Sequence, residues 1–221
     1  MLRILAFGVA GILFAACDKK SNTDRTAPPL LENHPVENTD FRDGDIVFQI
    51  SQSDQSQAIQ LATGSKYSHC GIIYHSNQGD GPQVLEAIGP VRFTALEEWT
   101  KRGEGGKFVV KRVKNADTKL PQPLRERMKS VGARFLGKPY DLTFEWSDEK
   151  IYCSELIWKI YQEGANLEVG KMQRLKDFDL SAEQVKQKLR ERYGQNLPLE
   201  EQVVSPAAIF ESELLETVFA N

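Results

Sequence analysis

Short hydrophobic stretches with the period of β-strands occur at several places in the chain, each bounded by turn-forming residues. They predict strands over residues 46–50, 66–74, 83–88, 107–113 and 214–219. In the second strand, the alternation places Tyr67 and His69 on one face and Cys70 on the other.

Helical spacing of hydrophobic residues occurs between these strands. It predicts helices over residues 53–62, 94–99 and 123–135, an exposed helix over residues 179–193, and a short helical turn after Ser205-Pro206. Residues 94–97 have the Thr-x-x-Glu pattern of a capping box, so we expect Thr94 to cap the second of these helices.

The most informative hydrophobic stripe lies in residues 151–161. Its members follow at intervals of three and four residues from Cys153 to Tyr161, which predicts an amphipathic helix that begins with the cysteine. The free N–H groups and the positive dipole end of a helix favour an anion, so a cysteine placed there acquires a lowered pKa. Cys153 is therefore a candidate nucleophile, and the alternative is a small hydrophobic residue of the core.

Composition limits the kind of protein. The chain has 221 residues, of which 40% are hydrophobic and 27% are charged. These values suit one globular domain with a full core. The net charge is −3 and the lysines and arginines are dispersed, so we expect no nucleic-acid partner.

The N-terminal segment differs from the rest. An uncharged hydrophobic run over residues 4–14 follows Arg3 and is too short to span a bilayer, so we expect residues 1–16 to be a secretory signal peptide. Residues 17–40 are polar and contain prolines, which predicts a flexible tether. The folded domain is then expected over residues 41–221.

The end of the hydrophobic run carries a resemblance of its own. Ala15-Ala16-Cys17 resembles the lipobox of bacterial lipoproteins, in which the signal is cut before a cysteine that carries the lipid. The resemblance implies a lipid anchor at Cys17 and a periplasmic, membrane-attached protein of the bacterial cell envelope. The alternative is a plain signal peptide cut after Ala16, which would leave a soluble periplasmic protein.

Two polar residues of the predicted strands are candidates for contact. Glu86 lies between hydrophobic residues on one strand face, where a carboxylate needs a partner. If the second and third strands form a hairpin closed around residues 77–78, Glu86 stands opposite His69. A slip of two residues would leave them diagonal neighbours, and a slip of one would separate them. Alternatively, the hairpin faces solvent and neither residue has a function.

The segment around Cys153 resembles a known family. Gly137-Lys-Pro-Tyr140 followed by Tyr152-Cys-Ser-Glu155 resembles the nucleophile segment of NlpC/P60 cysteine peptidases, in which a Gly-x-Pro-Tyr loop precedes a helix that opens with Cys-Ser. In those enzymes the histidine strand follows the cysteine, whereas here His69 precedes it by 84 residues.

This order is similar to that of the circularly permuted YiiX and YaeF-like hydrolases, which are related to the lecithin retinol acyltransferase group. Further motifs of these hydrolases are matched by Asp43-Gly-Asp45, Tyr67-Ser-His69, Leu85-Glu86-Ala87 and Ser205-Pro206.

The resemblance implies an α+β, circularly permuted papain-like fold, in which an antiparallel sheet packs against the helix that carries the cysteine. It also implies that Cys153 is the nucleophile, that His69 is the general base and acid, and that Glu86 orients the imidazole. The N–H of Cys153 would contribute to the oxyanion hole. We expect Tyr67 and Tyr152 either in the core or in the wall of the substrate pocket.

Together with the N-terminal signal, the resemblance predicts a thiol hydrolase that cleaves amide bonds in cell-wall peptides without a cofactor. The alternatives are an esterase or acyltransferase acting on lipids, and a binding module without turnover. The three histidines and two mature cysteines show no paired spacing for a metal. We expect Cys70 to pack in the core, with a disulfide to Cys153 as the alternative in an oxidising compartment.

Lipidation of Cys17 can be tested on protein isolated from membranes. We expect mass spectrometry to show a mature N-terminus at Cys17 that carries acyl chains, because more than one chain is needed for stable anchoring. The Cys17→Ala variant should lack the modification. A mature species that starts at an unmodified residue would contradict the prediction.

Overall fold

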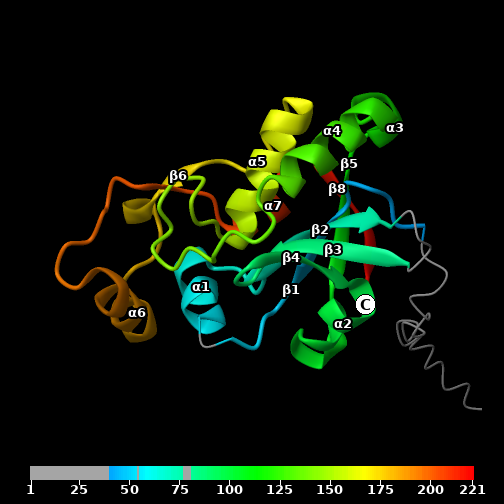
Figure 1. Cartoon of the computed structure of the whole chain (residues 1–221). Coiled ribbons are helices and arrows are strands. Elements are labelled where there is room, and N and C mark those ends of the chain that lie inside the picture. The colour runs from blue at the N-terminus through cyan, green and yellow to red at the C-terminus, as the bar shows by residue number, and fades with distance from the viewer. Residues whose placement is uncertain (1–39, 54, 77–80) are drawn as a thin grey trace, which may run out of the picture. The chain divides into compact units, whose positions relative to one another are not determined.

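The computed structural model describes residues 40–53, 55–76 and 81–221, so the predicted signal peptide and nearly all of the predicted tether lie outside the described residues. Its centre is a six-stranded antiparallel sheet with the order β4-β3-β2-β1-β5-β8 (Figure 1). The strands are β1 (Ile46–Gln49), β2 (His69–His75), β3 (Pro82–Ala87), β4 (Val91–Ala95), β5 (Val109–Val113) and β8 (Leu215–Ala220).

Seven α-helices surround this sheet in the described ranges. They are α1 (Ser56–Thr63), α2 (Leu96–Lys101), α3 (Ala116–Lys119), α4 (Gln122–Ala133), α5 (Cys153–Ala165), α6 (Glu183–Tyr193) and α7 (Pro206–Phe210). Two 3₁₀ helices, η2 (Glu104–Gly106) and η3 (Leu175–Asp177), and a two-stranded sheet of β6 (Gln173–Arg174) and β7 (Gln202–Val203) complete the fold. Over the described ranges, no helix has the length and apolar character needed to cross a membrane.

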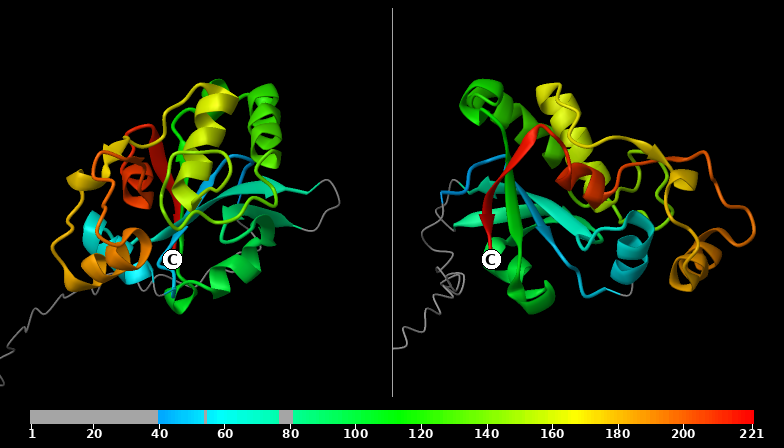
Figure 2. Two further views of the ribbon diagram at one scale, coloured as in Figure 1. Left: turned by 60° about the vertical axis from the view of Figure 1, so that its left-hand side comes forward. Right: turned by 180° about the vertical axis from the view of Figure 1, so that it is seen from behind.

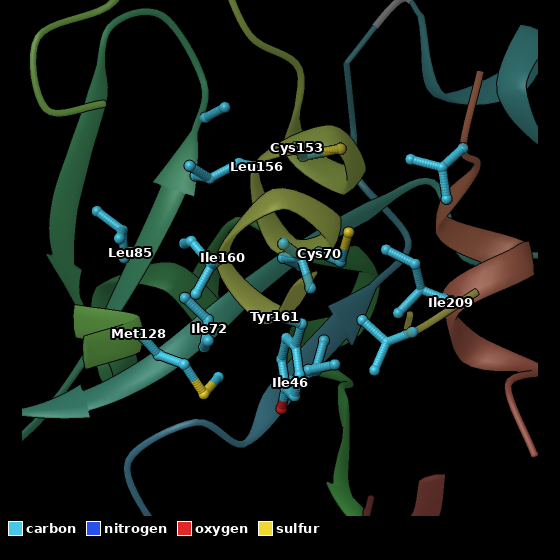
Figure 3. Packing of buried hydrophobic residues seen from close by; sticks show 14 of the residues in the cluster. Ile46, Cys70, Ile72, Leu85, Met128, Cys153, Leu156, Ile160, Tyr161 and Ile209 are labelled. Atoms are coloured by element: carbon cyan, nitrogen blue, oxygen red, sulfur yellow. The ribbon is translucent and has the colours of Figure 1, made fainter. Parts of the chain in front are cut away.

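Helix α5 lies at the centre of the largest hydrophobic cluster and begins at Cys153, as the sequence predicted. Its residues Leu156, Ile160 and Tyr161 have no solvent exposure (Figure 3). Burial of one such side chain contributes about 1.5–3 kcal/mol to stability. Helix α4 packs beside α5 over the sheet (Figure 2). Gly164 permits the close approach of the two helices, since a Cβ at this position would lie only 2.5 Å from the side chain of Met128.

The sheet is covered on both faces. Cys70 and Ile72 of β2 belong to the cluster under α5, whereas Ile73 belongs to a smaller cluster on the other face together with Trp99 of α2. His69, the first residue of β2, stands at the end of the strand. The alternation predicted for this strand is therefore confirmed from His69 onward. The prediction was wrong for Tyr67, which precedes the strand and belongs to the cluster of Cys70.

Helix α6 is not the exposed helix that the sequence predicted. Its residues Val185 and Leu189 are buried in a third cluster with Ala58 of α1 and Leu175 of η3. The polar residues on the other side of α6 dominate its sequence pattern, so the two buried positions were too few to indicate an inward face. Helices α1 and α6 thus pack together at one end of the sheet (Figure 1).

The register of the β2–β3 hairpin differs from the predicted one. Ile72 pairs with Leu85, which is a shift of two residues from the predicted pairing of His69 with Glu86. Residues 77–78, around which the hairpin was predicted to close, lie outside the described residues. Because the shift is even, His69 and Glu86 remain diagonal neighbours on one face of the sheet.

Thr94 does not cap a helix. It lies in β4, a strand that the sequence analysis did not predict, and α2 begins after Ala95 without a side-chain cap. The hydroxyl of Thr94 instead donates a hydrogen bond of 2.7 Å to Oε1 of Glu86. The capping box does not form because Thr94 pairs with Val84 in the sheet and β4 continues through Ala95, so α2 starts one residue too late for Thr94 to be its N-cap.

Candidate active site

His69 and Glu86 form the centre of the candidate site. Nε2 of His69 lies 2.7 Å from Oε2 of Glu86, whose side chain has no solvent exposure. The diagonal position on one sheet face brings the two side chains together. With Nε2 engaged by the carboxylate, Nδ1 is the ring nitrogen left for a second partner.

Three groups share the carboxylate of Glu86. Besides His69, the hydroxyl of Thr94 donates to it, and the guanidinium of Arg102 forms an ion pair with it. Burial alone would raise the pKa of Glu86, but the hydrogen bond and charge of His69, with Thr94 and Arg102, lower it to about 2. Glu86 is therefore a carboxylate at every physiological pH.

Cys153 meets His69 at the first turn of α5. The residue before it, Tyr152, is the N-cap, and the Glu155 side chain accepts a hydrogen bond from the backbone N–H of Tyr152. The N–H of Cys153 is at the first position of the helix, where no intrahelical acceptor exists, so it is available to an oxyanion. Cys153 is only 3% exposed.

The electrostatics of the site favour a thiolate beside an imidazolium. The pKa of Cys153 lies well below its usual range because Cys70 hydrogen-bonds to its sulfur and because His69 adds a hydrogen bond and a positive charge, which together outweigh burial. Burial alone would lower the pKa of His69, but interactions with Cys153 and Glu86 raise it to about 9. Proton transfer from the thiol to the imidazole is thus favoured in the resting site.

Cys70 packs in the core, as the sequence predicted, and it also interacts with Cys153. It is buried under α5, and its sulfur is directed towards the turn that carries Cys153 (Figure 3). Burial and the neighbouring sulfur of Cys153 raise the pKa of Cys70, so it stays protonated and serves as a hydrogen-bond donor. Both cysteines are free thiols in the structure, so the alternative of a disulfide between them is not observed.

Tyr140 and Gln55 are site residues to which the sequence analysis gave no role. Nε2 of Gln55 donates to the phenolic oxygen of Tyr140 at 3.3 Å. Burial and the charge of Cys153 raise the pKa of Tyr140, so the phenol remains protonated. The Gly-Lys-Pro-Tyr motif marked this tyrosine, but its position beside the cysteine depends on a loop whose course the sequence pattern does not reveal.

Two pockets adjoin these residues. The apolar pocket is bounded by α1, α6 and the first turn of α5, and its lining includes Cys153, Tyr152 and Ser154. The mixed pocket has a lining that is more apolar than polar, and this lining includes His69, Arg102 and Leu142.

The two predicted substrate-binding tyrosines have different surroundings. Tyr152 lines the apolar pocket, and its hydroxyl accepts the N–H of Val204 at 3.2 Å. Tyr67 stacks on Phe210, with ring centroids 4.2 Å apart, and lines neither the apolar nor the mixed pocket. Of the two expected positions, core or pocket wall, Tyr67 thus has the core position.

The remaining aromatic and histidine residues lie around or away from the site. Trp99 is fully buried and stacks beside His69, with ring centroids 5.8 Å apart. His75 pairs with Asp43 at 2.8 Å at the far end of β2. Of the two histidines in the described residues, only His69 is therefore placed to act on Cys153.

A histidine on an antiparallel sheet and a cysteine at the start of a packed helix define a papain-like cysteine hydrolase, here with the histidine strand first. The family model of the permuted papain-like amidases, the YaeF/YiiX or C92 family, matches residues 40–219. The chain belongs to this family.

Two relatives agree with this assignment. The chain is 51% identical over 175 residues to the uncharacterized protein YiiX of Escherichia coli K12, which covers 79% of this chain and 84% of that protein. It is 50% identical to YiiX of Escherichia coli O157:H7, whose crystal structure superposes with a TM-score of 0.77 over 81% of this chain and 97% of that chain. The permuted papain-like fold predicted from the sequence is thereby confirmed.

The O157:H7 relative is described as a metalloprotein. In the part of this chain that the structure describes, no three side chains of His, Cys, Asp or Glu cluster as a metal site would require. The described donor set therefore does not fit a metal ion, and we derive no step through one.

The lowered pKa of Cys153 predicts selective alkylation. At about pH 6.5, iodoacetamide should label Cys153 at least about tenfold faster than Cys70, because only the former is a thiolate. His69→Ala should slow the labelling of Cys153, since the imidazolium that stabilises the thiolate is removed. After denaturation both cysteines should react alike; equal rates in the folded protein would refute an activated thiol.

The role of Glu86 can be separated from simple packing by its effect on pH dependence. Glu86→Gln keeps the shape but removes the charge that raises the pKa of His69, so turnover should fall at least about tenfold. The alkaline limb of kcat/KM, expected near pH 9 where His69 loses its proton, should move to lower pH.

Glu98→Gln, an exposed position on α2, is the matched control and should change neither quantity. If Glu86 served only the fold, Glu86→Gln would lower Tm and leave turnover per folded molecule and the pH profile unchanged.

Proposed function

We propose that this protein is a thiol amidase, in which Cys153 is the nucleophile, His69 carries the proton and Glu86 holds the imidazole. The observation that carries the proposal is the continuous contact from the buried carboxylate through His69 to a cysteine at the start of α5. Such a contact supports acyl transfer, because it supplies a nucleophile, an acid–base group and an orienting group.

Acylation begins with the Cys153 thiolate. The sulfur attacks the carbonyl carbon of the amide, and the carbonyl oxygen becomes negative near the N–H of Cys153. The imidazolium of His69 then gives its proton to the departing nitrogen as the C–N bond breaks. The products of this step are a free amine, a thioester and a neutral imidazole.

Deacylation reverses the proton transfer. His69, now neutral, accepts a proton from water while the water oxygen attacks the thioester carbonyl. The C–S bond breaks, the thiolate returns beside the imidazolium, and the acid is released. Glu86 keeps the imidazole in one orientation through both steps because its carboxylate remains bonded to Nε2.

The proposal includes the location and substrate that the sequence predicted. A lipid anchor at Cys17 would hold the domain at the periplasmic side of a membrane, where cell-wall peptides and other acyl amides are present. A catalytic role is favoured over a binding module because a low thiol pKa next to a raised imidazole pKa has no use in binding alone.

An acyl-enzyme provides the test. The protein is mixed with a cell-wall peptide or an N-acyl amide and quenched in acid within one turnover, and the peptide that contains Cys153 is analysed by mass spectrometry. We expect the acyl mass on Cys153 together with a stoichiometric burst of amine, and neither in Cys153→Ala. A folded protein that releases amine without an adduct at Cys153, or that never releases amine, would contradict the proposal.

A further inference from the structure

The two cysteines of the described residues are neighbours in the protein interior, although the amidase mechanism forms bonds with only one of them. Cys70 of β2 and Cys153 of α5 are buried in the same hydrophobic cluster, and both are free thiols. The sulfur of Cys70 is directed towards the turn that carries Cys153 and hydrogen-bonds to its sulfur (Figure 3). A disulfide requires a sulfur–sulfur distance of about 2 Å, so a small movement of the first turn of α5 would join the two residues.

The two sulfur atoms differ in protonation. The pKa of Cys153 lies below its usual range because Cys70 and His69 hydrogen-bond to its sulfur, whereas burial raises the pKa of Cys70. Peroxides react with thiolates and hardly at all with thiols. Cys153 is therefore the residue that a peroxide oxidises first.

The two sulfur atoms also differ in access. Cys153 lines the apolar pocket, whose volume is about 90 Å³, whereas a water molecule requires roughly 10–15 Å³. A small peroxide therefore has room beside Cys153. Cys70 lines neither the apolar nor the mixed pocket. In the described part of the chain, Cys70 is thus reached by the sulfur of Cys153 but not from these pockets.

The fate of an oxidised cysteine depends on such a neighbour. A sulfenic acid that meets a second thiol condenses with it to a disulfide, which thiols can reduce again. A sulfenic acid without a second thiol is oxidised further to sulfinic and sulfonic acids, which are not reduced in this way. Cys70 has the position of the second thiol, and the proposed periplasmic location is an oxidising compartment.

We propose that Cys153 and Cys70 form a reversible redox pair, in which a peroxide oxidises Cys153 and Cys70 converts the product into a disulfide. The disulfide occupies the nucleophile, so the protein in this state cannot form an acyl-enzyme. The inference goes beyond the amidase function and does not depend on it, because both steps use only the two cysteines, the proton of His69 and the peroxide.

The first step consumes the peroxide. The Cys153 sulfur attacks one oxygen of hydrogen peroxide, and the O–O bond breaks. The departing hydroxide takes the proton of the His69 imidazolium, so the products are a sulfenic acid, water and a neutral imidazole. The sulfur has lost two electrons and the peroxide has gained them.

The second step forms the disulfide. The sulfur of Cys70 attacks the sulfur of the sulfenic acid, and the S–O bond breaks. The thiol proton of Cys70 leaves with the hydroxyl group as a second water molecule. A dithiol reverses the oxidation, because it returns two electrons to the disulfide and becomes a disulfide itself.

Peptide mapping of the full-length protein tests the redox pair. The purified protein is treated with a small excess of hydrogen peroxide, denatured with iodoacetamide and digested with trypsin without reduction. Cys70 and Cys153 fall in different tryptic peptides, residues 67–92 and 151–159. We expect these two peptides to be joined, with a mass lower by two hydrogen atoms than their sum. In the folded oxidised protein, alkylation of Cys153 should be at least about tenfold slower, and dithiothreitol should restore it.

Variants of the second thiol separate the disulfide from simple oxidation. Cys70→Ser keeps a hydroxyl beside Cys153 but has no thiol, so dimedone should trap the sulfenic acid of Cys153 at least about tenfold more than in the parent protein. Longer treatment should convert Cys153 of this variant to a sulfinic acid that dithiothreitol does not reverse. Cys70→Ala should behave in the same way if the serine variant folds poorly. Ile72→Val, a small change in the same cluster on β2, is the matched control and should still form the disulfide.

Three results would overturn the redox pair: a sulfinic acid on Cys153 of the parent protein while Cys70 remains a thiol, a disulfide that joins Cys153 to Cys17 or to a second molecule, or no reaction of Cys153 with peroxide. These results are distinct from failure of the amidase proposal. A folded protein that forms the disulfide but never releases amine retains the redox pair and loses the amidase. One that forms an acyl-enzyme but gives only a sulfinic acid with peroxide retains the amidase and loses the redox pair.

Discussion

A carboxylate with no exposure to solvent is the constraint on which the site depends. The side chain of Glu86 is buried against the sheet, where an unpaired charge would cost several kcal/mol. The ionised form of Glu86 therefore requires hydrogen-bond donors, and these come from three parts of the chain: His69 of β2, Thr94 of β4 and Arg102 after α2. Because the carboxylate fixes the imidazole on one side, the other ring nitrogen faces the helix that begins with Cys153.

Sequence patterns predicted most of the parts of this site but fewer of its contacts. The helix start at Cys153 follows from a stripe with period 3.6, and the common face of His69 and Glu86 follows from a period of two. Because side chains alternate with a period of two, the error of two residues in the predicted register left His69 and Glu86 on the same face of the sheet. Contacts made by single polar side chains have no period, which is why the roles of Thr94, Arg102 and Gln55 were not predicted.

The alternation of β2 also explains why the contact of Cys70 with Cys153 was not predicted. His69 and Cys70 project to opposite faces of the sheet. From this alternation we expected only one of the two residues to contribute to the active site. However, α5 covers the face of Cys70, and its first turn lies at the end of the strand where His69 stands. The sulfur of Cys153 is therefore reached from both faces, by a thiol donor and by an imidazolium. The end of a strand, unlike its middle, permits this arrangement.

The ion pair between Arg102 and Glu86 compensates the charge of the carboxylate at each stage of the proposed reaction. In the resting site, the Cys153 thiolate balances the His69 imidazolium, and Arg102 balances Glu86. Once a thioester forms and the proton leaves with the amine, both members of the first pair are neutral. Without Arg102, Glu86 would then be an uncompensated buried charge beside a neutral imidazole, and the free energy of the acyl-enzyme would be raised. Arg102 keeps the carboxylate compensated in both states, so the imidazole can lose and regain its proton without the site losing its charge balance.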